Sequence, residues 1–130
     1  MVLTGGPDDR AAAAAALEAA GSHGRLTDLV GGTTVPQLVS LARRARLFVG
    51  CDTGPMHVAA AVDTPVIALF GPADPARTGP YGEGHVVLRE LPPCAPCHRK
   101  HCNQPRHACM EDLSVERVLA ATLSELQVDR

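Results

Sequence analysis

The chain has 130 residues, of which 45% are hydrophobic and 20% charged, and its formal net charge is −2. This length and composition suit a folded globular protein with a single domain over residues 1–130. The nearly balanced charge gives no electrostatic basis for binding nucleic acid or an anionic membrane surface. No apolar run approaches the roughly 18 residues of a membrane helix, and the first residues lack the pattern of a secretory signal. We therefore expect a cytoplasmic protein.

The first part of the chain alternates short apolar runs with helical patterns. Residues 2–6 predict a strand that runs into a glycine turn. Residues 7–20 predict a helix, because a proline and two aspartates precede a run of alanines. A short strand is expected within residues 26–32, and apolar residues at helical spacing predict a second helix over residues 34–45.

The second part predicts a sheet of parallel strands. Continuous apolar runs at residues 47–50 and 64–71 flank a helix that opens near residue 54. Strands of this kind that alternate with helices are typical of a parallel sheet covered on both faces. A last strand is expected within residues 85–90, after a long loop, and a helix capped by Ser114 closes the chain.

In an open parallel sheet, ligands bind beyond the carboxyl ends of the strands. Three loops of this chain should lie at such ends, and each contains glycine and polar residues. They run from Thr4 to Asp9, from Gly50 to His57 and from Gly71 to Gly82. This layout indicates a nucleotide site, although the dinucleotide-binding pattern GxGxxG is absent.

The middle loop carries the clearest signal. Pro55 suits the first position of a helix, and Gly54 would let a ligand approach the backbone closely. The N–H groups of Met56 and His57 would then face an incoming anion, with help from the helix dipole. The His57 side chain could add a further donor to a phosphate. The plainer interpretation is that Thr53 simply caps the helix.

Other polar residues near these loops also have plain interpretations. Asp8 and Asp9 could serve only to favour the start of the first helix. Cys51 is interpreted as a small, buried apolar side chain at the end of a strand.

The stretch "FVGCDTGPMHVAAAVDTPVIALFGPADPARTGPYG", residues 48–82, resembles the signature of glycosyltransferase family nine, the ADP-heptose:lipopolysaccharide heptosyltransferases. The resemblance begins at "VLTGGPDD" and continues into "CMEDLSVERVL", so it covers nearly the whole chain. It implies a GT-B fold, which has two Rossmann-like halves with the reaction in the cleft between them. The expected fold class is therefore α/β, a Rossmann-like parallel sheet with flanking helices, as the C-terminal, donor-binding half of a GT-B fold.

The resemblance also implies roles for individual residues. Asp52 would contact the donor sugar, and the turn from Thr53 to His57 would surround the donor diphosphate. Asp9, with Asp8 as a substitute, would bind the ribose hydroxyls, and the loop at Thr33 and Thr34 would lie beside the adenine. The expected donor-binding residues are Asp9, Thr33, Thr34, Asp52, Thr53, Gly54, Pro55, Met56 and His57.

The function that this resemblance implies is transfer of heptose from an ADP-activated donor to the lipopolysaccharide inner core. The catalytic base would belong to the N-terminal half, so we expect no catalytic residue in this chain, no catalytic cofactor, and no activity of the chain alone. A peripheral association with the inner membrane is a further expectation. The alternative is a nucleotide- or zinc-binding Rossmann-like interaction module without transferase activity. A half-protein should also be marginally stable or self-associate.

A Cys/His/Pro-rich insertion is expected at residues 92–112. Its cysteines supply the soft ligands that a structural zinc ion needs. The candidate metal ligands are Cys94, Cys97, Cys102 and Cys109. Because the spacing of the second pair is irregular, free thiols and a disulfide remain open as alternatives.

Overall fold

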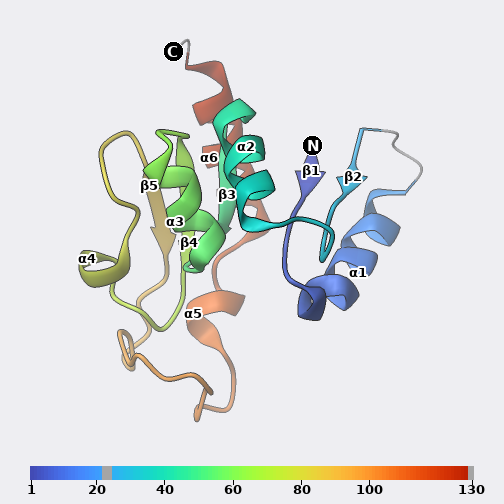
Figure 1. Cartoon of the computed structure of the whole chain (residues 1–130). Coiled ribbons are helices and arrows are strands. Elements are labelled where there is room, and N and C mark those ends of the chain that lie inside the picture. The colour runs from blue at the N-terminus through green and yellow to red at the C-terminus, as the bar shows by residue number, and fades with distance from the viewer. Residues whose placement is uncertain (22–24, 129–130) are drawn as a thin grey trace. The chain divides into compact units, whose positions relative to one another are not determined.

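The computed structural model describes residues 1–21 and 25–128, which fall into two compact units, Met1–Leu41 and Ala42–Arg130 (Figure 1). The single domain over residues 1–130, with its insertion at residues 92–112, stays a prediction. None of the described helices is both long and apolar enough to cross a membrane.

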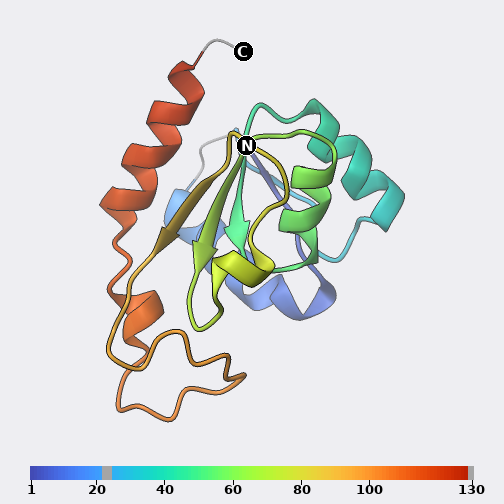
Figure 2. The same cartoon turned by 90° about the vertical axis from the view of Figure 1, so that its left-hand side faces the viewer.

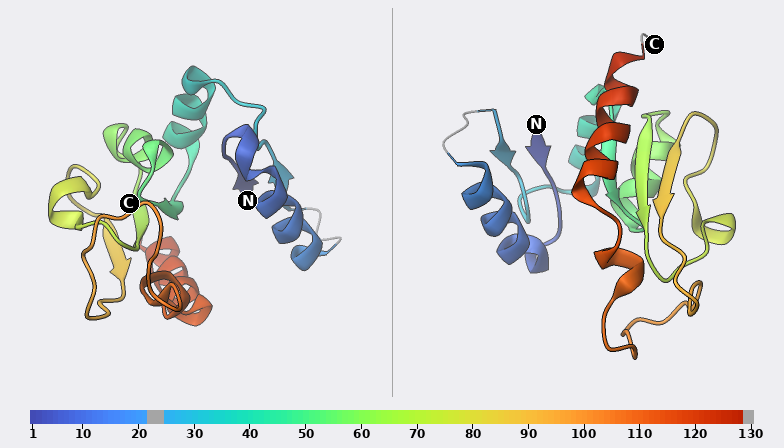
Figure 3. Two further views of the ribbon diagram at one scale, coloured as in Figure 1. Left: turned by 90° about the horizontal axis from the view of Figure 1, so that it is seen from below. Right: turned by 180° about the vertical axis from the view of Figure 1, so that it is seen from behind.

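The first unit contains a pair of parallel strands with a helix beside it (Figure 3). The strands pair in the register Val2↔Thr27 and Leu3↔Asp28. The predicted first helix is present but opens with a turn of 3-10 helix, and the chain leaves it at Gly21 with a φ of 62°. The elements are β1 (Val2–Leu3), η1 (Pro7–Asp9), α1 (Arg10–Ala20), β2 (Thr27–Asp28) and α2 (Val35–Arg44), whose last residues belong to the second unit.

The second unit is built on a parallel sheet in the order β3-β4-β5. Helix α3 lies on one face of this sheet and α6 runs along the other (Figures 1 and 2). The elements are β3 (Phe48–Cys51), α3 (Gly54–Ala61), β4 (Val66–Phe70), α4 (Pro75–Thr78), β5 (Val86–Arg89), α5 (Ala108–Glu111) and α6 (Val115–Gln127).

The core of the second unit lies between β4 and α3. Met56 and Phe70 are fully buried, and small alanines let α3 pack closely on the sheet. Thr64, at the turn between these elements, is also buried, and its hydroxyl donates to the carbonyl of Ala42 at 2.7 Å. Helix α3, which follows the loop after β3, is therefore tightly packed on the sheet.

The sheet has helices on both faces, as expected, but the cover is incomplete at β3. Burial alternates along β3, and Val49 and Cys51 are exposed, whereas nearly all of β4 is buried. The order of the strands explains this difference, because β4 is flanked by strands on both sides within this sheet and β3 on one.

The predicted cap of the last helix is confirmed, since Ser114 Oγ accepts the N–H of Arg117 at 3.2 Å. Arg117 also pairs with Glu90 and so ties the start of α6 to the end of β5. Much of the apolar face of α6 is nonetheless exposed, including Leu119 and Leu123.

Candidate functional site

The loops that follow β3 and β4 meet at the carboxyl edge of the sheet, as the strand order requires. Asp52 comes directly after β3, and Thr78 closes the short helix α4 in the loop after β4. The Thr78 hydroxyl donates to Asp52 Oδ2 at 2.9 Å, although the two residues are 26 positions apart. This bond fixes one oxygen of the Asp52 carboxylate.

Helix α4 and its threonine were not predicted, because the stretch was interpreted as a loop. A signal for this helix is present in the sequence. Asp74 stands directly before Pro75, a pairing of cap and first-turn residue that marks helix starts. In the structure Asp74 Oδ1 accepts the N–H of Ala76 at 3.1 Å, which is the bond that such a cap makes.

His57 lies on the other side of the Asp52 carboxylate. Its Nε2 atom is 3.6 Å from Asp52 Oδ1, so a protonated His57 forms an ion pair with Asp52. The side chains of His57 and Asp52 are 46% and 22% exposed, and a ligand can therefore reach both. The carboxylate thus stands between a hydroxyl donor and an imidazole.

The start of α3 differs from the sequence prediction in two ways. Thr53 is the N-cap residue of α3, as the plainer interpretation expected, but its hydroxyl donates to the carbonyl of Cys51 at 3.3 Å and accepts no helix N–H. The N–H groups of Met56 and His57 are not free either, because both donate to the Thr53 carbonyl, at 3.0 and 3.4 Å. The first turn of this helix closes on its own backbone.

The remaining backbone donor of this turn is Gly54, since Pro55 carries no N–H. Among the described residues, the N–H of Gly54 has no acceptor. A Cβ atom built on Gly54 would meet nothing within 4 Å, so the space beside it is open. The groups of the helix start that remain available to a ligand are therefore the Gly54 N–H and the His57 side chain.

Cys51 lies at the exposed end of β3, and the expectation that it is buried is wrong. Partial desolvation of its thiol raises the pKa of Cys51, and the negative charge of Asp52 raises this pKa further. The thiol is therefore protonated at neutral pH and is a poor nucleophile.

In the first unit, Asp9 has the local role expected of an acid at a helix start. Its Oδ2 atom accepts the N–H of Gly6 at 2.8 Å. Thr34 precedes α2, and both its N–H and its hydroxyl donate to Gln37 Oε1, at 2.8 and 2.9 Å. Thr33, beside it, is partly buried. Asp9 and Asp8 are both exposed, so their carboxylates remain accessible to a ligand.

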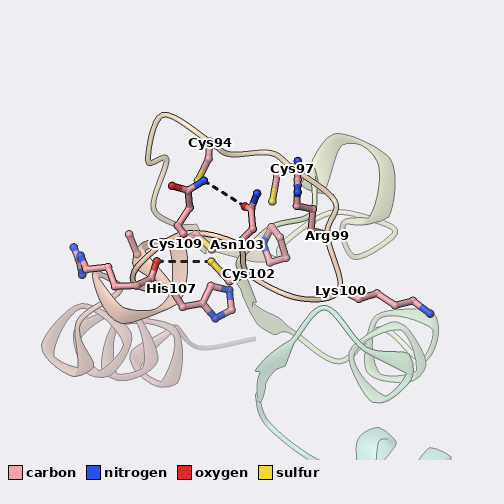
Figure 4. A pocket seen from close by; sticks show the side chains of 12 residues that line it. Cys94, Cys97, Arg99, Lys100, Cys102, Asn103, His107 and Cys109 are labelled. Carbon is pink, nitrogen blue, oxygen red and sulfur yellow. Dashed lines mark hydrogen bonds between the residues drawn. The ribbon is translucent and has the colours of Figure 1, made fainter.

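The cysteines predicted as metal ligands line one pocket, shown in Figure 4, and all of them are free thiols. Burial raises the pKa of the Cys109 thiol, and the nearby Cys102, Cys94 and Cys97 raise it further in that order. Within the described residues, no group of three or more His, Cys, Asp or Glu side chains is gathered as a bound metal ion requires.

A parallel α/β sheet with an acid, a histidine and an open glycine at its carboxyl edge is a layout found in enzymes that bind nucleotides. Comparison with known proteins narrows this class to the glycosyltransferases. Residues 1–107 match the family model of glycosyltransferase family 9 (heptosyltransferase). The chain belongs to this family, and the resemblance seen in its sequence is confirmed.

Individual relatives agree with this assignment. The chain is 42% identical over 85 residues to lipopolysaccharide heptosyltransferase 1 of Pseudomonas aeruginosa, which covers 61% of the chain and 24% of that protein. It is 33% identical over 121 residues to lipopolysaccharide heptosyltransferase 2 of Salmonella typhimurium, with 92% of the chain and 35% of that protein covered.

Solved structures confirm the fold class. The E. coli ADP-heptose lps heptosyltransferase II superposes with a TM-score of 0.80 and 30% identity, over 96% of this chain and 35% of that one. A glycosyl transferase family 9 structure from Veillonella parvula gives a TM-score of 0.78 and 25% identity, over 96% of this chain and 36% of that one. The fold is α/β, with parallel sheets and flanking helices of the GT-B type. The chain thus spans about a quarter to a third of the length of these relatives.

Proposed function

We propose that this chain binds the nucleotide-sugar donor of a heptosyltransferase, as the donor-binding half of an enzyme that transfers heptose to the lipopolysaccharide inner core. The observation that carries the proposal is the arrangement around Asp52. A carboxylate held by Thr78 and faced by His57 stands beside the open backbone at Gly54. Family membership supplies the chemical class of the ligand.

The site can recognise two parts of one donor molecule. The Gly54 N–H and the His57 side chain are the donors for the diphosphate, aided by the positive end of the α3 dipole. The oxygens of Asp52 are acceptors for hydroxyl groups of the sugar. Thr53, Pro55 and Met56 contribute the backbone that shapes this turn.

The family resemblance, rather than the placement of the two units, assigns the nucleoside part of the donor to Asp9, Thr33 and Thr34. A carboxylate such as Asp9 can accept hydrogen bonds from both ribose hydroxyls. The loop at Thr33 and Thr34 provides backbone groups for the adenine. The exposure of Asp9 supports its role, because a ligand can reach this residue although its carboxylate also accepts the N–H of Gly6.

The reaction proposed for the whole enzyme is direct displacement at the anomeric carbon. A base from outside the described residues deprotonates the acceptor hydroxyl, and the donors around Gly54 and His57 stabilise the charge that grows on the leaving diphosphate. Without that base the chain alone should not transfer sugar. In this proposal the enzyme acts in the cytoplasm, in peripheral association with the inner membrane.

Calorimetric titration of the chain with ADP tests the proposal. We expect ADP to bind, and His57→Ala to weaken binding about tenfold, since a hydrogen bond to a charged group contributes roughly 1.5–3 kcal/mol. Combining His57→Ala with Asp9→Ala should abolish measurable binding. His101→Ala, at an exposed histidine outside the site, is the matched control.

A folded chain that binds no ADP would refute the proposal. If such a chain still bound zinc, the alternative of an interaction module without transferase activity would gain support. Circular dichroism of each variant should accompany the titrations, because loss of binding is informative only when the variant is folded.

A further inference from the structure

The pocket in the cysteine-rich segment takes no part in the proposed donor site. Four of its lining residues are cysteines, which come from both ends of the segment, and Pro72 of the loop after β4 closes one side. Figure 4 shows the thiols of Cys94 and Cys97 on one side of this pocket, with Cys102 and Cys109 across from them. The enclosed space is about 60 Å³. This is enough for a single ion, since a cavity needs only about 10–15 Å³ of such space to hold one water molecule.

The backbone holds the first two thiols in place. The N–H of Ala95 donates to the carbonyl of Pro92 at 2.8 Å, and the N–H of His98 donates to the carbonyl of Pro72, also at 2.8 Å. His98 has a φ of 54°, a left-handed conformation that residues other than glycine seldom adopt. The chain therefore turns sharply directly after Cys97, and its thiol stays on the pocket side of the turn.

The other two thiols come from the far side of the segment. Cys109 is buried in α5, and a Cβ atom on Gly71 would lie 3.6 Å from its Sγ atom, so α5 packs against the end of β4. The Cys102 thiol makes only a weak, 3.7 Å bond to the carbonyl of Arg106. That bond is easily exchanged for a stronger ligand.

The segment has few other means of staying ordered. Between β5 and α6 it forms one short helix, and Cys109 is its only fully buried side chain among the described residues. A chain stretch that buries so little apolar surface usually depends on a cross-link or a metal for its conformation. The polar surroundings fit a metal, because Arg99 and Lys100 also line the pocket and can offset an excess of negative charge.

We propose that Cys94, Cys97, Cys102 and Cys109 bind one zinc ion as thiolates, and that this ion joins the two ends of the segment to each other. Binding releases four protons, one from each thiol, and leaves a tetrahedral centre with a net charge of −2. The thiols face a common pocket without being gathered at ligand distance, so zinc draws them together and replaces the bond of Cys102 to Arg106.

Metal analysis of the full chain, purified under reducing conditions without chelator, tests this inference. We expect one zinc per chain, and a cobalt-substituted form with the absorption of a tetrahedral thiolate centre. Cys97→Ser and Cys102→Ser should each lose the metal. The matched control is Cys51→Ser, which removes the one cysteine outside the pocket and should keep a full equivalent of zinc.

Proteolysis provides a second measurement that does not depend on variants. Trypsin cleaves after Arg99 and Lys100, which are exposed between the two pairs of cysteines. Zinc should protect these bonds, and a chelator should raise the cleavage rate there at least tenfold.

Four outcomes would overturn the proposal. They are a folded, reduced chain without metal, an intact mass that reveals a disulfide within the segment, cobalt absorption without thiolate character, and loss of zinc in Cys51→Ser. Failure of ADP binding would not contradict the zinc proposal, because the pocket shares no residue with the proposed donor site.

Discussion

Thr78 gives the sharpest test of how the donor site is built. The change Thr78→Val removes the hydroxyl that donates to Asp52 Oδ2 at 2.9 Å and keeps the branched shape of the side chain. A hydrogen bond to a charged group typically contributes about 1.5–3 kcal/mol. Thr78 is exposed, so water can replace its hydroxyl in the variant. We therefore expect Thr78→Val to lose only about 1 kcal/mol of binding free energy, near the upper end for exposed charged pairs. This corresponds to about a fivefold change in affinity.

The loss should appear for only one of two ligands. Asp52 is assigned to the sugar, so Thr78→Val should weaken binding of an ADP-sugar about fivefold and leave ADP binding unchanged. Calorimetric titration with both ligands measures the difference. Thr78→Ser, which retains the hydroxyl, should behave like the unchanged chain. Equal losses for ADP and the ADP-sugar, or a loss in Thr78→Ser, would show that Thr78 does not act by positioning Asp52.

Three further predictions concern stability, titration and association. Thr64→Val removes the hydrogen bond from the Thr64 hydroxyl to the Ala42 carbonyl and should lower the free energy of unfolding, measured by urea titration, by about 1 kcal/mol. The loss stays small because this carbonyl keeps its bond from a backbone N–H. A loss above about 3 kcal/mol would contradict this account. Because the pKa of Cys51 is raised in the folded chain, the unfolded chain releases this proton first, and the folded chain loses stability as the pH rises above the ordinary thiol pKa of about 8.5. Cys51→Ser should remove this contribution to the loss of stability at alkaline pH. Replacing the exposed Leu119 and Leu123 by glutamine should reduce concentration-dependent association in sedimentation and change the unfolding free energy by less than about 0.5 kcal/mol. Unchanged association would show that this face of α6 does not cause it.

The elements of the second unit that follow from local patterns were predictable. The apolar run of β4 is long enough to be buried on both faces, and glycine with proline marks the start of α3. The apolar run at β3 predicted the same burial and was wrong there. Its residues resemble those of β4, and only the position in the sheet distinguishes the two strands.

The sequence predicted residues of the proposed donor site but not their contacts. Asp52 and His57 were identified from their place in the motif. The bond from Thr78 could not be, because it depends on how two loops meet across the edge of the sheet. The prediction for the backbone donors of α3 failed for a different reason. In a helix that begins at Gly54, the carbonyl of Thr53 accepts the N–H of His57, four residues further on, and here it also accepts the N–H of Met56.

The cysteine spacing shows a different limit of sequence reasoning. The spacing identified four ligand candidates but left zinc, free thiols and a disulfide open. The pocket narrows the question, since thiols from the two ends of the segment face one space while none is bonded to another. Chain spacing cannot establish this, because the residues between Cys97 and Cys109 have almost no helix or strand to fix their path.

Asp52 raises an electrostatic question, because a carboxylate beside the start of a helix should repel an incoming diphosphate. Two unit charges 4 Å apart in water interact by about 1 kcal/mol, and a protonated His57 offsets part of the Asp52 charge. When the diphosphate binds, we expect the His57 side chain to leave Asp52 and pair with a phosphate oxygen instead. The carboxylate then has one oxygen free for a sugar hydroxyl, while Thr78 still holds the other. On this argument the acid lowers affinity for the bare nucleotide and favours the nucleotide that carries a sugar, so Asp52→Asn should bind ADP more tightly and the ADP-sugar less tightly than the unchanged chain.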